Sequence, residues 1–139
     1  MRIDELFASA ASQGTTPVSF EMFPPKGELT LERAREVGER FAELSPSFVS
    51  VTYSAGGSTN NAATTQIASM LTRELGITSC AHQTCISLHR EDLPTKIAEL
   101  HSAGIENVLA LRGDRVAGCE TTDYAYAKDI IGRLSDEGF

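Results

Sequence analysis

The sequence predicts an α/β fold in which short parallel strands alternate with longer amphipathic helices. Four apolar segments of strand length are separated by runs whose apolar residues recur every three or four positions, the spacing of one helix face. Glu21, Thr52, His82 and Arg112 lie near the strand ends and are about 30 residues apart, the size of one strand, one helix and two loops. Strands that alternate with helices in this way form a parallel sheet with the helices packed outside it.

The composition fits one folded domain. The chain has 139 residues, of which 41% are hydrophobic, and a formal net charge of −7. This acidic balance argues against a nucleic-acid scaffold and against binding to an anionic membrane surface. No apolar run approaches the ~20 residues needed to cross a bilayer, and charges interrupt the N-terminus where an export signal would be apolar. We therefore expect a single cytoplasmic domain over residues 1–139, without nucleic-acid or membrane partners.

Four strands are predicted, at residues 18–23, 48–53, 78–85 and 107–111. The first ends at Pro24-Pro25, because two prolines cannot continue a paired strand.

The predicted helices are each defined by one apolar face. The first helix spans about 15 residues before Pro46 and uses Leu31, Ala34, Val37, Phe41 and Leu44. The second is capped by Asn60 or Asn61 and stops at Gly76, and its face is formed by Ile67, Met70, Leu71 and Leu75.

Two further helices and an N-terminal extension complete the expected elements. The third helix starts at Asp92 and Pro94, stops at Gly104, and turns Leu93, Ile97 and Leu100 inward. The fourth is capped by Asp123 and turns Tyr126, Ile130 and Leu134 inward. A short amphipathic segment around Ile3, Leu6 and Phe7 forms a helical extension over residues 1–14.

The cysteines do not form a disulfide framework. Cys80, Cys85 and Cys119 are an odd and sparse set, without the spacing of a zinc site. We expect small buried or half-buried thiols in a reducing cytosol, and no metal site.

The absence of phosphate-binding fingerprints separates two parallel architectures. A doubly wound nucleotide-binding sheet would carry a G-x-G-x-x-G motif after the first strand, and neither this motif nor a P-loop occurs. The pattern therefore favours the units of a (β/α)8, or TIM-type, barrel. A complete barrel needs about 250 residues, so this chain holds four of eight units, a half barrel. Its two unpaired edge strands suggest a homo-oligomer in which two halves associate, or a missing C-terminal half.

The polar residues at the strand ends are the candidate site, because barrel enzymes place their chemistry there. Glu21 lies between Phe20 and Met22, and apolar surroundings would raise the pKa of its carboxyl group, as suits a general acid. A salt bridge from Glu21 to Arg112 is the alternative. Gly113 would let a planar ligand approach the main chain.

A glycine-rich segment after the second predicted strand has two interpretations. Gly56-Gly57-Ser58 could cradle a phosphate with backbone N–H groups, or be only a loop.

Four motifs resemble the methylenetetrahydrofolate reductase family. They lie at 19–25, 48–53, 82–85 and 109–114, in that family's order and spacing, and the resemblance covers roughly residues 17–134. It implies a (β/α)8 barrel that binds FAD along its strand ends. Such an enzyme takes hydride from NAD(P)H onto the flavin and passes it to methylenetetrahydrofolate, giving methyltetrahydrofolate for one-carbon metabolism and methionine biosynthesis.

The resemblance also implies roles for particular residues. Glu21 matches the general acid that opens the five-membered ring of the folate to an iminium ion. Asp114 matches a carboxylate that contacts the pterin beside the flavin. The positions that match FAD-lining residues are Thr52, Tyr53, His82, Leu111, Arg112, Gly113, Tyr126 and Ala127.

The chain departs from the family in lacking its second half. The missing part includes an alanine-tyrosine-proline-glutamate motif and a later glutamine that holds the folate, so we expect the isolated chain to be incomplete for turnover. Two other interpretations stay open. One is a non-catalytic half barrel that serves as an assembly unit, and the other is a flavin-free barrel enzyme acting on folate or another pterin.

Overall fold

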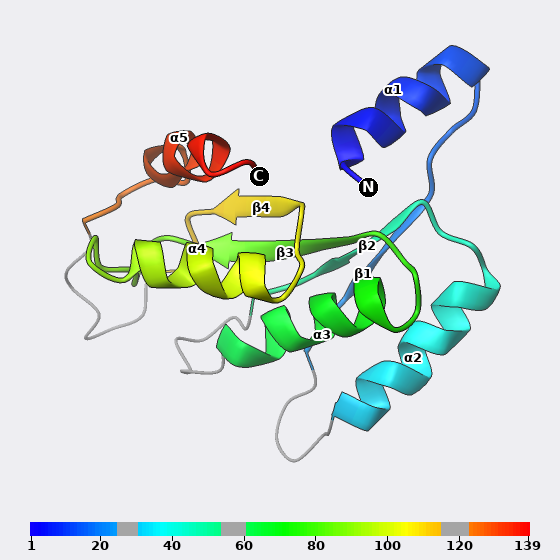
Figure 1. Cartoon of the computed structure of the whole chain (residues 1–139), viewed down its shortest axis with the longest axis horizontal. Helices are drawn as coiled ribbons and strands as arrows, with labels where there is room; N and C mark the ends of the chain where they lie inside the picture. Colours follow the sequence, from blue (N-terminus) through cyan, green and yellow to red (C-terminus); the bar gives the residue numbers. More distant parts are fainter. Residues whose placement is uncertain (25–30, 54–60, 115–122) are drawn as a thin grey trace.

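Figure 1 shows the computed structural model, which describes residues 1–24, 31–53, 61–114 and 123–139. Along the chain the elements are α1 (Ile3–Gln13), β1 (Ser19–Met22), α2 (Leu31–Glu43), β2 (Phe48–Val51), α3 (Asn61–Arg73), β3 (Ser79–Thr84), α4 (Leu93–Ser102), β4 (Val108–Leu111) and α5 (Lys128–Asp136). Each predicted strand is present, shortened by one or two residues at its ends.

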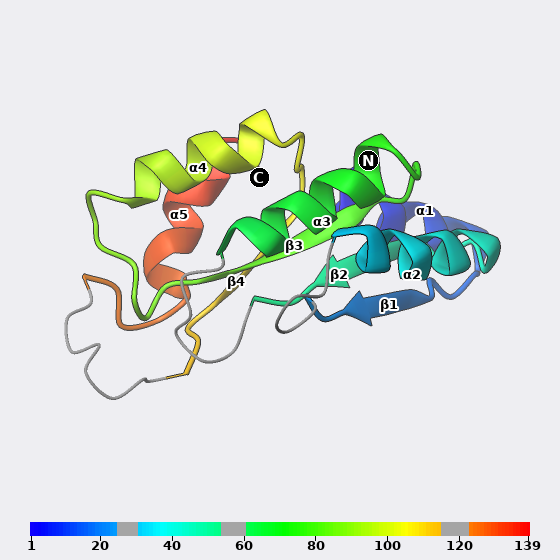
Figure 2. The same cartoon turned by 90° about the horizontal axis from the view of Figure 1, so that it is seen from below.

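The strands form one parallel sheet in the order β1-β2-β3-β4, so each strand pairs with the next one along the chain. This order and the helix after each strand confirm the predicted arrangement of (β/α) units, four of which are present. Figure 2 shows α2, α3 and α4 together on one side of the sheet.

The strand register assigns side chains to two faces, because successive residues of a strand point to opposite sides. Met22, Val51, Ala81 and Val108 form one row across all four strands. This row points toward the helices, and we call its side the covered face. The opposite side, the open face, carries Glu21, Ser50, Cys80, His82 and Leu109.

The hydrophobic core lies on the covered face. One cluster packs α3 against β1, β2 and β3, and it includes Val49, Val51, Ile67 and Leu71, which are almost inaccessible to solvent. A second cluster packs α4 and α5 against β3 and β4 around Cys85, Ile97 and Ile130. Burying a side chain of this size contributes about 1.5–3 kcal/mol, so this face supplies most of the fold's stability.

The apolar face predicted for α2 is only partly confirmed. Leu31, Val37 and Leu44 are exposed, whereas Gly38 is buried beside Ala34. A Cβ built on Gly38 would lie 2.7 Å from Cδ1 of Leu75, so glycine is what lets α2 approach α3 this closely. The expected stripe was wrong in part because a glycine contact carries no hydrophobicity signal.

The next two helices confirm their predicted faces. Ile67, Met70 and Leu71 of α3 are buried and Leu75 is partly buried. Leu93, Ile97 and Leu100 of α4 are buried as well. Asp92 precedes α4 without making a side-chain capping bond, and Asn60 lies outside the described residues.

Helix α5 differs from the prediction in where it starts and in one residue of its buried face. Ile130 and Leu134 are buried as predicted, but Tyr126 is exposed and Tyr124 is buried instead. Asp123 does not cap this helix, since its carboxylate accepts a hydrogen bond from the backbone N–H of Arg90 at 2.7 Å. Asp129 accepts from the backbone N–H groups of Ala125 and Tyr126, both at 2.9 Å.

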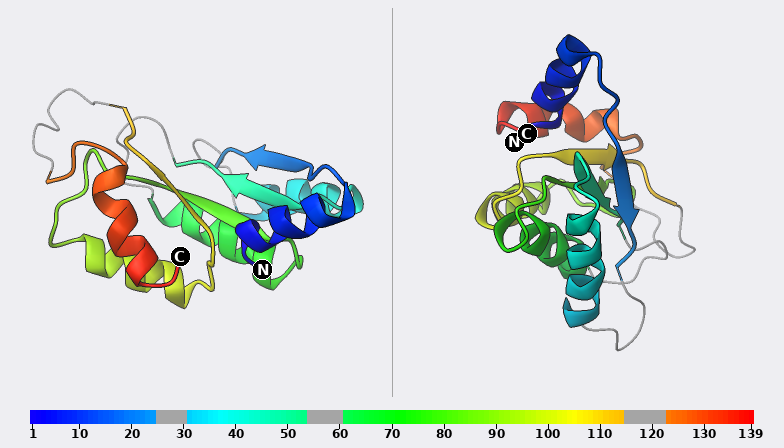
Figure 3. Two further views of the ribbon diagram at one scale, coloured as in Figure 1. Left: turned by 90° about the horizontal axis from the view of Figure 1, so that it is seen from above. Right: turned by 90° about the vertical axis from the view of Figure 1, so that its right-hand side faces the viewer.

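Helix α1 lies at the amino-terminal end of the sheet. Its Phe7 ring meets the Phe48 ring of β2 edge-on, with centroids 6.1 Å apart. The Asn107 side chain before β4 accepts from the N–H of Ile3 at 2.8 Å and donates to the carbonyl of Met1. Arg2 donates to the carbonyl oxygen of Gly138 at 3.0 Å, which brings the two ends of the chain together (Figure 3).

In the described parts of the chain, no helix is both long enough and apolar enough to cross a membrane. Those same parts contain no cluster of three or more His, Cys, Asp or Glu side chains that could hold a metal ion. Cys80 and Cys85 are buried free thiols, as predicted. Cys119 lies outside the described residues.

Candidate functional site

The carboxyl ends of the four strands lie along one edge of the sheet, because all four run in the same direction. Six of the predicted site residues come from this edge or the loops that leave it: Thr52, Tyr53, Leu111, Arg112, Gly113 and Asp114. Glu21 and His82 lie within β1 and β3, on the open face.

Glu21 and His82 form the closest pair of ionisable groups on the open face. Oε2 of Glu21 lies 3.8 Å from Nε2 of His82, across the intervening strand β2. The Glu21 side chain is 49% exposed, whereas that of His82 is 8% exposed. Edge strand β1 has a neighbour on one side, while β3 has two, and this difference explains the two exposures.

The His82 imidazole is electrostatically unusual. Its Nε2 atom is buried and has no hydrogen-bond partner among the described residues. Burial lowers the pKa of His82, and the carboxylate of Glu21 opposes that shift. A buried polar atom without a partner costs about 1–3 kcal/mol, so this nitrogen is available to a proton or to a bound molecule.

Apolar surroundings are not found around Glu21. Phe20 points to the covered side, where its ring stacks on Phe41 with centroids 4.7 Å apart, and Met22 belongs to the core. Alternation along the strand places these neighbours on the opposite face from Glu21. The alternative partner Arg112 is also not bonded to Glu21; its Nε donates to the carbonyl oxygen of Gly113 at 3.2 Å.

Thr52 and Tyr53 directly follow β2, and hydrogen bonds hold the backbone of Thr52 in place. The N–H of Thr52 donates to the carbonyl of Met22 at 2.9 Å, and the hydroxyl of Thr64 donates to the carbonyl of Thr52 at 3.0 Å. Burial raises the pKa of the Tyr53 phenol, and the polar side chains of Thr84 and Gln83 oppose that shift. The two hydrogen bonds of Thr52 tie the end of β2 to β1 and to α3.

The end of β4 is held against the end of β3. The carbonyls of Leu111 and Arg112 accept from the N–H groups of Cys85 at 3.0 Å and Ile86 at 2.8 Å. Gly113 has φ +84°, and a Cβ there would lie 3.0 Å from Cβ of Thr84. The position therefore requires glycine, and it starts the turn that carries Asp114.

The remaining predicted residues are placed at the surface. Asp114 is exposed, and no hydrogen bond or ion pair joins it to Glu21 or His82 within the described structure. Tyr126 is exposed, with Nζ of Lys128 5.6 Å from its ring centroid, and Ala127 precedes the first residue of α5. Gly56-Gly57-Ser58 lies outside the described residues.

Three supporting residues were missed at the sequence level. Thr64 and Gln83 are buried polar residues, and Thr84 lines both Tyr53 and Gly113. Gln83 adjoins His82 in the sequence, which was a usable signal. Thr64 lies in the first turn of α3. The sequence carried no signal for its role, because a threonine near the start of a helix is common.

Cys80 lies on the open face, two residues before His82. Burial raises the pKa of its thiol to about 11, so it stays protonated near neutral pH. This thiol does not serve as a nucleophile in the site.

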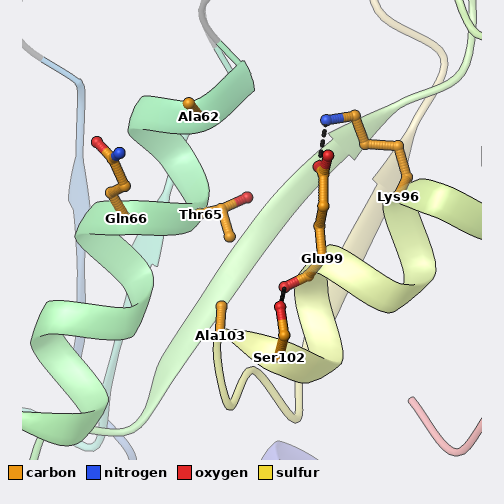
Figure 4. Close-up of a pocket in the computed structure, with 7 residues that line it drawn as sticks. All are labelled: Ala62, Thr65, Gln66, Lys96, Glu99, Ser102 and Ala103. Carbon is orange, nitrogen blue, oxygen red and sulfur yellow. Dashed lines mark hydrogen bonds and ion pairs between the residues drawn. The ribbon is translucent and has the colours of Figure 1, made fainter.

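A groove of about 420 Å³ lies away from these residues, between α3 and α4 on the helical side (Figure 4). Lys96 and Glu99 form an ion pair of 2.5 Å across one side of it. The groove is bordered by surface side chains of two helices and does not belong to the edge described above.

Comparison with known proteins adds independent findings. A family model described as methylenetetrahydrofolate reductase matches residues 6–138. Methylenetetrahydrofolate reductase (NADH) 1 of Arabidopsis thaliana is 38% identical over 96% of this chain and 23% of its own length. The 5,10-methylenetetrahydrofolate reductases of Salmonella typhimurium and Escherichia coli are 34% and 32% identical, over 91% of this chain and 42% of their own lengths. The chain thus spans less than half the length of these relatives.

Proposed function

The chain belongs to the methylenetetrahydrofolate reductase family, and we propose that it forms part of a flavin-dependent enzyme that reduces 5,10-methylenetetrahydrofolate to 5-methyltetrahydrofolate with NAD(P)H. The observation that carries this proposal is the Glu21–His82 pair on the open face, 3.8 Å apart and beside the ends of parallel strands. In this proposal residues 1–139 are the N-terminal half of a (β/α)8 barrel, and residues 1–14 are a helical extension.

The residues present fit FAD as the cofactor. Exposed Leu109 pairs with His82 in the register of β3 and β4, and it offers an apolar surface on the open face against which a planar ring system can lie. Thr52, Tyr53, His82, Leu111, Arg112 and Gly113 would hold FAD, with Tyr126 and Ala127 of the last unit contributing further contacts. When bound, FAD supplies hydride transfer between the nicotinamide and the folate.

The protein's own contribution is proton transfer and charge stabilisation. Hydride addition to a neutral aminal carbon is poor, so the folate ring must first open to an iminium cation. Glu21 is half exposed on the open face, so it can reach a bound folate and protonate the departing nitrogen. Asp114, at the end of β4, would stabilise the developing positive charge as a nearby carboxylate.

Two assignments about the cellular protein accompany this function. Free buried thiols at Cys80 and Cys85 support a reducing compartment, and we assign the protein to the cytoplasm. Among the described residues, strands β1 and β4 each have one unpaired edge, which supports association with a second half or a second copy.

Colour and ligand binding of the natural protein, isolated from its own cells, test the proposal against its alternatives. A yellow protein whose released chromophore is FAD, and which binds the folate, agrees with the flavin-dependent reductase. A colourless protein that binds folate would point to a flavin-free barrel enzyme. A protein that binds neither ligand would point to an assembly unit and would overturn the proposal.

A further inference from the structure

The open face contains one buried nitrogen that lacks a partner and has a carboxylate beside it. Nε2 of His82 has no hydrogen bond in the described structure, and Oε2 of Glu21 lies 3.8 Å from it. That separation is longer than a hydrogen bond by less than 1 Å. The Glu21 side chain is half exposed and can rotate to close it.

We propose that, when a ligand covers the open face, Glu21 and His82 form a pair that shares a single proton, and that His82 is the positioning residue that restores this proton to the Glu21 carboxyl group. This proposal rests on the proposed function for the use to which Glu21 puts that proton. The pair itself is a property of the chain, because both residues lie in the described sheet.

The surroundings of the pair limit which groups can share the proton. Strands β2 and β4, which pair with β3 on its two sides, carry no titratable side chain. Strand β1 carries Glu21, and β3 carries Cys80 besides His82. The Cys80 thiol stays protonated near neutral pH because burial raises its pKa, so among the side chains of these four strands the exchange involves Glu21 and His82.

One proton in this pair has two possible positions. It can lie on Nε2, giving an imidazolium beside a carboxylate, or on Oε2, giving a neutral imidazole that accepts from a carboxylic acid. In the free chain, burial lowers the pKa of His82, and water solvates the half-exposed Glu21 side chain. A planar ligand that covers the open face would remove that water, and exclusion of water favours the neutral arrangement with the proton on Glu21.

The cycle balances in protons. Glu21 transfers its proton to a nitrogen of the substrate and becomes a carboxylate. When the product leaves and water returns to the open face, Nε2 of the imidazole takes up one proton from a hydronium ion of the solvent and passes it to Oε2. The pair returns to its starting state with one proton consumed, as the ring opening requires.

The test is a ¹³C NMR titration of the 139-residue chain labelled in its Glu carboxyl and His ring carbons. We expect Glu21→Gln to lower the titration midpoint of His82 by more than about 0.3 pH unit, because a carboxylate about 4 Å away favours the imidazolium. Glu32→Gln removes an equal charge on exposed α2 and should leave the midpoint unchanged. His89 and His101, both exposed, are internal references whose signals also report that each variant is folded.

The wild-type chain provides a second measurement that needs no variant. The Glu21 carboxyl carbon should show a second inflection at the midpoint of His82, since the two titrations are coupled. A His82 midpoint that moves by less than about 0.3 pH unit in folded Glu21→Gln, or a Glu21 curve without that second inflection, would overturn the pair. Neither result depends on bound FAD or folate, so a failure of the pair is distinguishable from a failure of the proposed reductase.

Discussion

The two faces of the sheet differ in what their side chains do. On the covered face, Met22, Val51 and Ala81 form a row that is almost inaccessible to solvent and packs against the helices. One residue earlier on each strand, Glu21, Ser50 and Cys80 form a row on the open face, which ends in a half-exposed carboxylate. Neighbouring residues of the same strands thus serve stability on one side and chemistry on the other.

The largest expected loss of stability comes from a truncation in the core of the covered face. Leu71→Ala removes a fully buried side chain from the cluster between α2, α3 and the sheet. It should lower the free energy of unfolding by about 3 kcal/mol, the transfer and cavity cost of such a truncation. Urea unfolding followed by circular dichroism measures this loss.

The matched truncation on the open face is Leu109→Ala, at a side chain that is 44% exposed. It should cost less than about 1 kcal/mol, because little apolar area is lost. If the two leucine variants lost equal stability, the distinction between the faces would be wrong.

The next largest loss of stability is expected at Gly113, at the carboxyl end of β4. Gly113→Ala should lower the free energy of unfolding by about 1–3 kcal/mol, because its φ of +84° is strained for alanine and the new methyl group would press on Thr84. Thermal and urea unfolding of the purified variant measure this loss.

Gly132→Ala is the control, since nothing lies within 4 Å of its Cβ position in α5. Alanine there should stabilise the chain by about 0.5–1 kcal/mol. The same sign of change in both glycine variants would mean that the turn at Gly113 is not constrained as described.

The smallest effect is the pH dependence of stability that comes from His82. Burial keeps its pKa below the ordinary value of 6.5 in the folded chain, so the folded chain binds fewer protons than the unfolded chain. This contribution to stability is complete above the unfolded pKa and is lost as the pH falls through the folded one. Urea midpoints measured from about pH 8 down to about pH 5 should therefore fall more in the wild type than in His82→Gln. If the urea midpoint fell equally in both proteins, His82 would not be a cause of the pH dependence of stability.

The sequence predicted the covered face better than the open one. Alternating apolar segments and the apolar faces of α3 and α4 were sufficient for the parallel order and for the core around Ile67 and Leu71. Those signals are strong because burial of apolar area selects the residues directly. The prediction failed for α2, where the close contact is made by Gly38, and for α5, where Tyr124 replaces Tyr126 in the core.

For the candidate site, the sequence predicted a set of residues, which stays a prediction, but it did not predict their contacts. A spacing of about 30 residues between the polar strand-end positions indicated that Glu21 and His82 belong to the first and third units. The apolar surroundings predicted for Glu21 from its sequence neighbours were wrong, because Phe20 and Met22 lie on the opposite face of the sheet. The orphaned nitrogen of His82 and the support from Thr64 depend on packing between segments far apart in the chain, which local pattern does not contain.

The most direct test of the account measures the two half-reactions of the proposed reductase in the natural protein, with Glu21 intact and with Glu21→Gln. Rapid mixing follows the flavin absorbance as NAD(P)H reduces it and, separately, as the folate reoxidises it. We expect the variant to lose folate reduction while flavin reduction stays close to the wild-type rate, because only the folate step needs the acid. Equal losses in both half-reactions would contradict the role assigned to Glu21 and, with it, the chemical function of the open face.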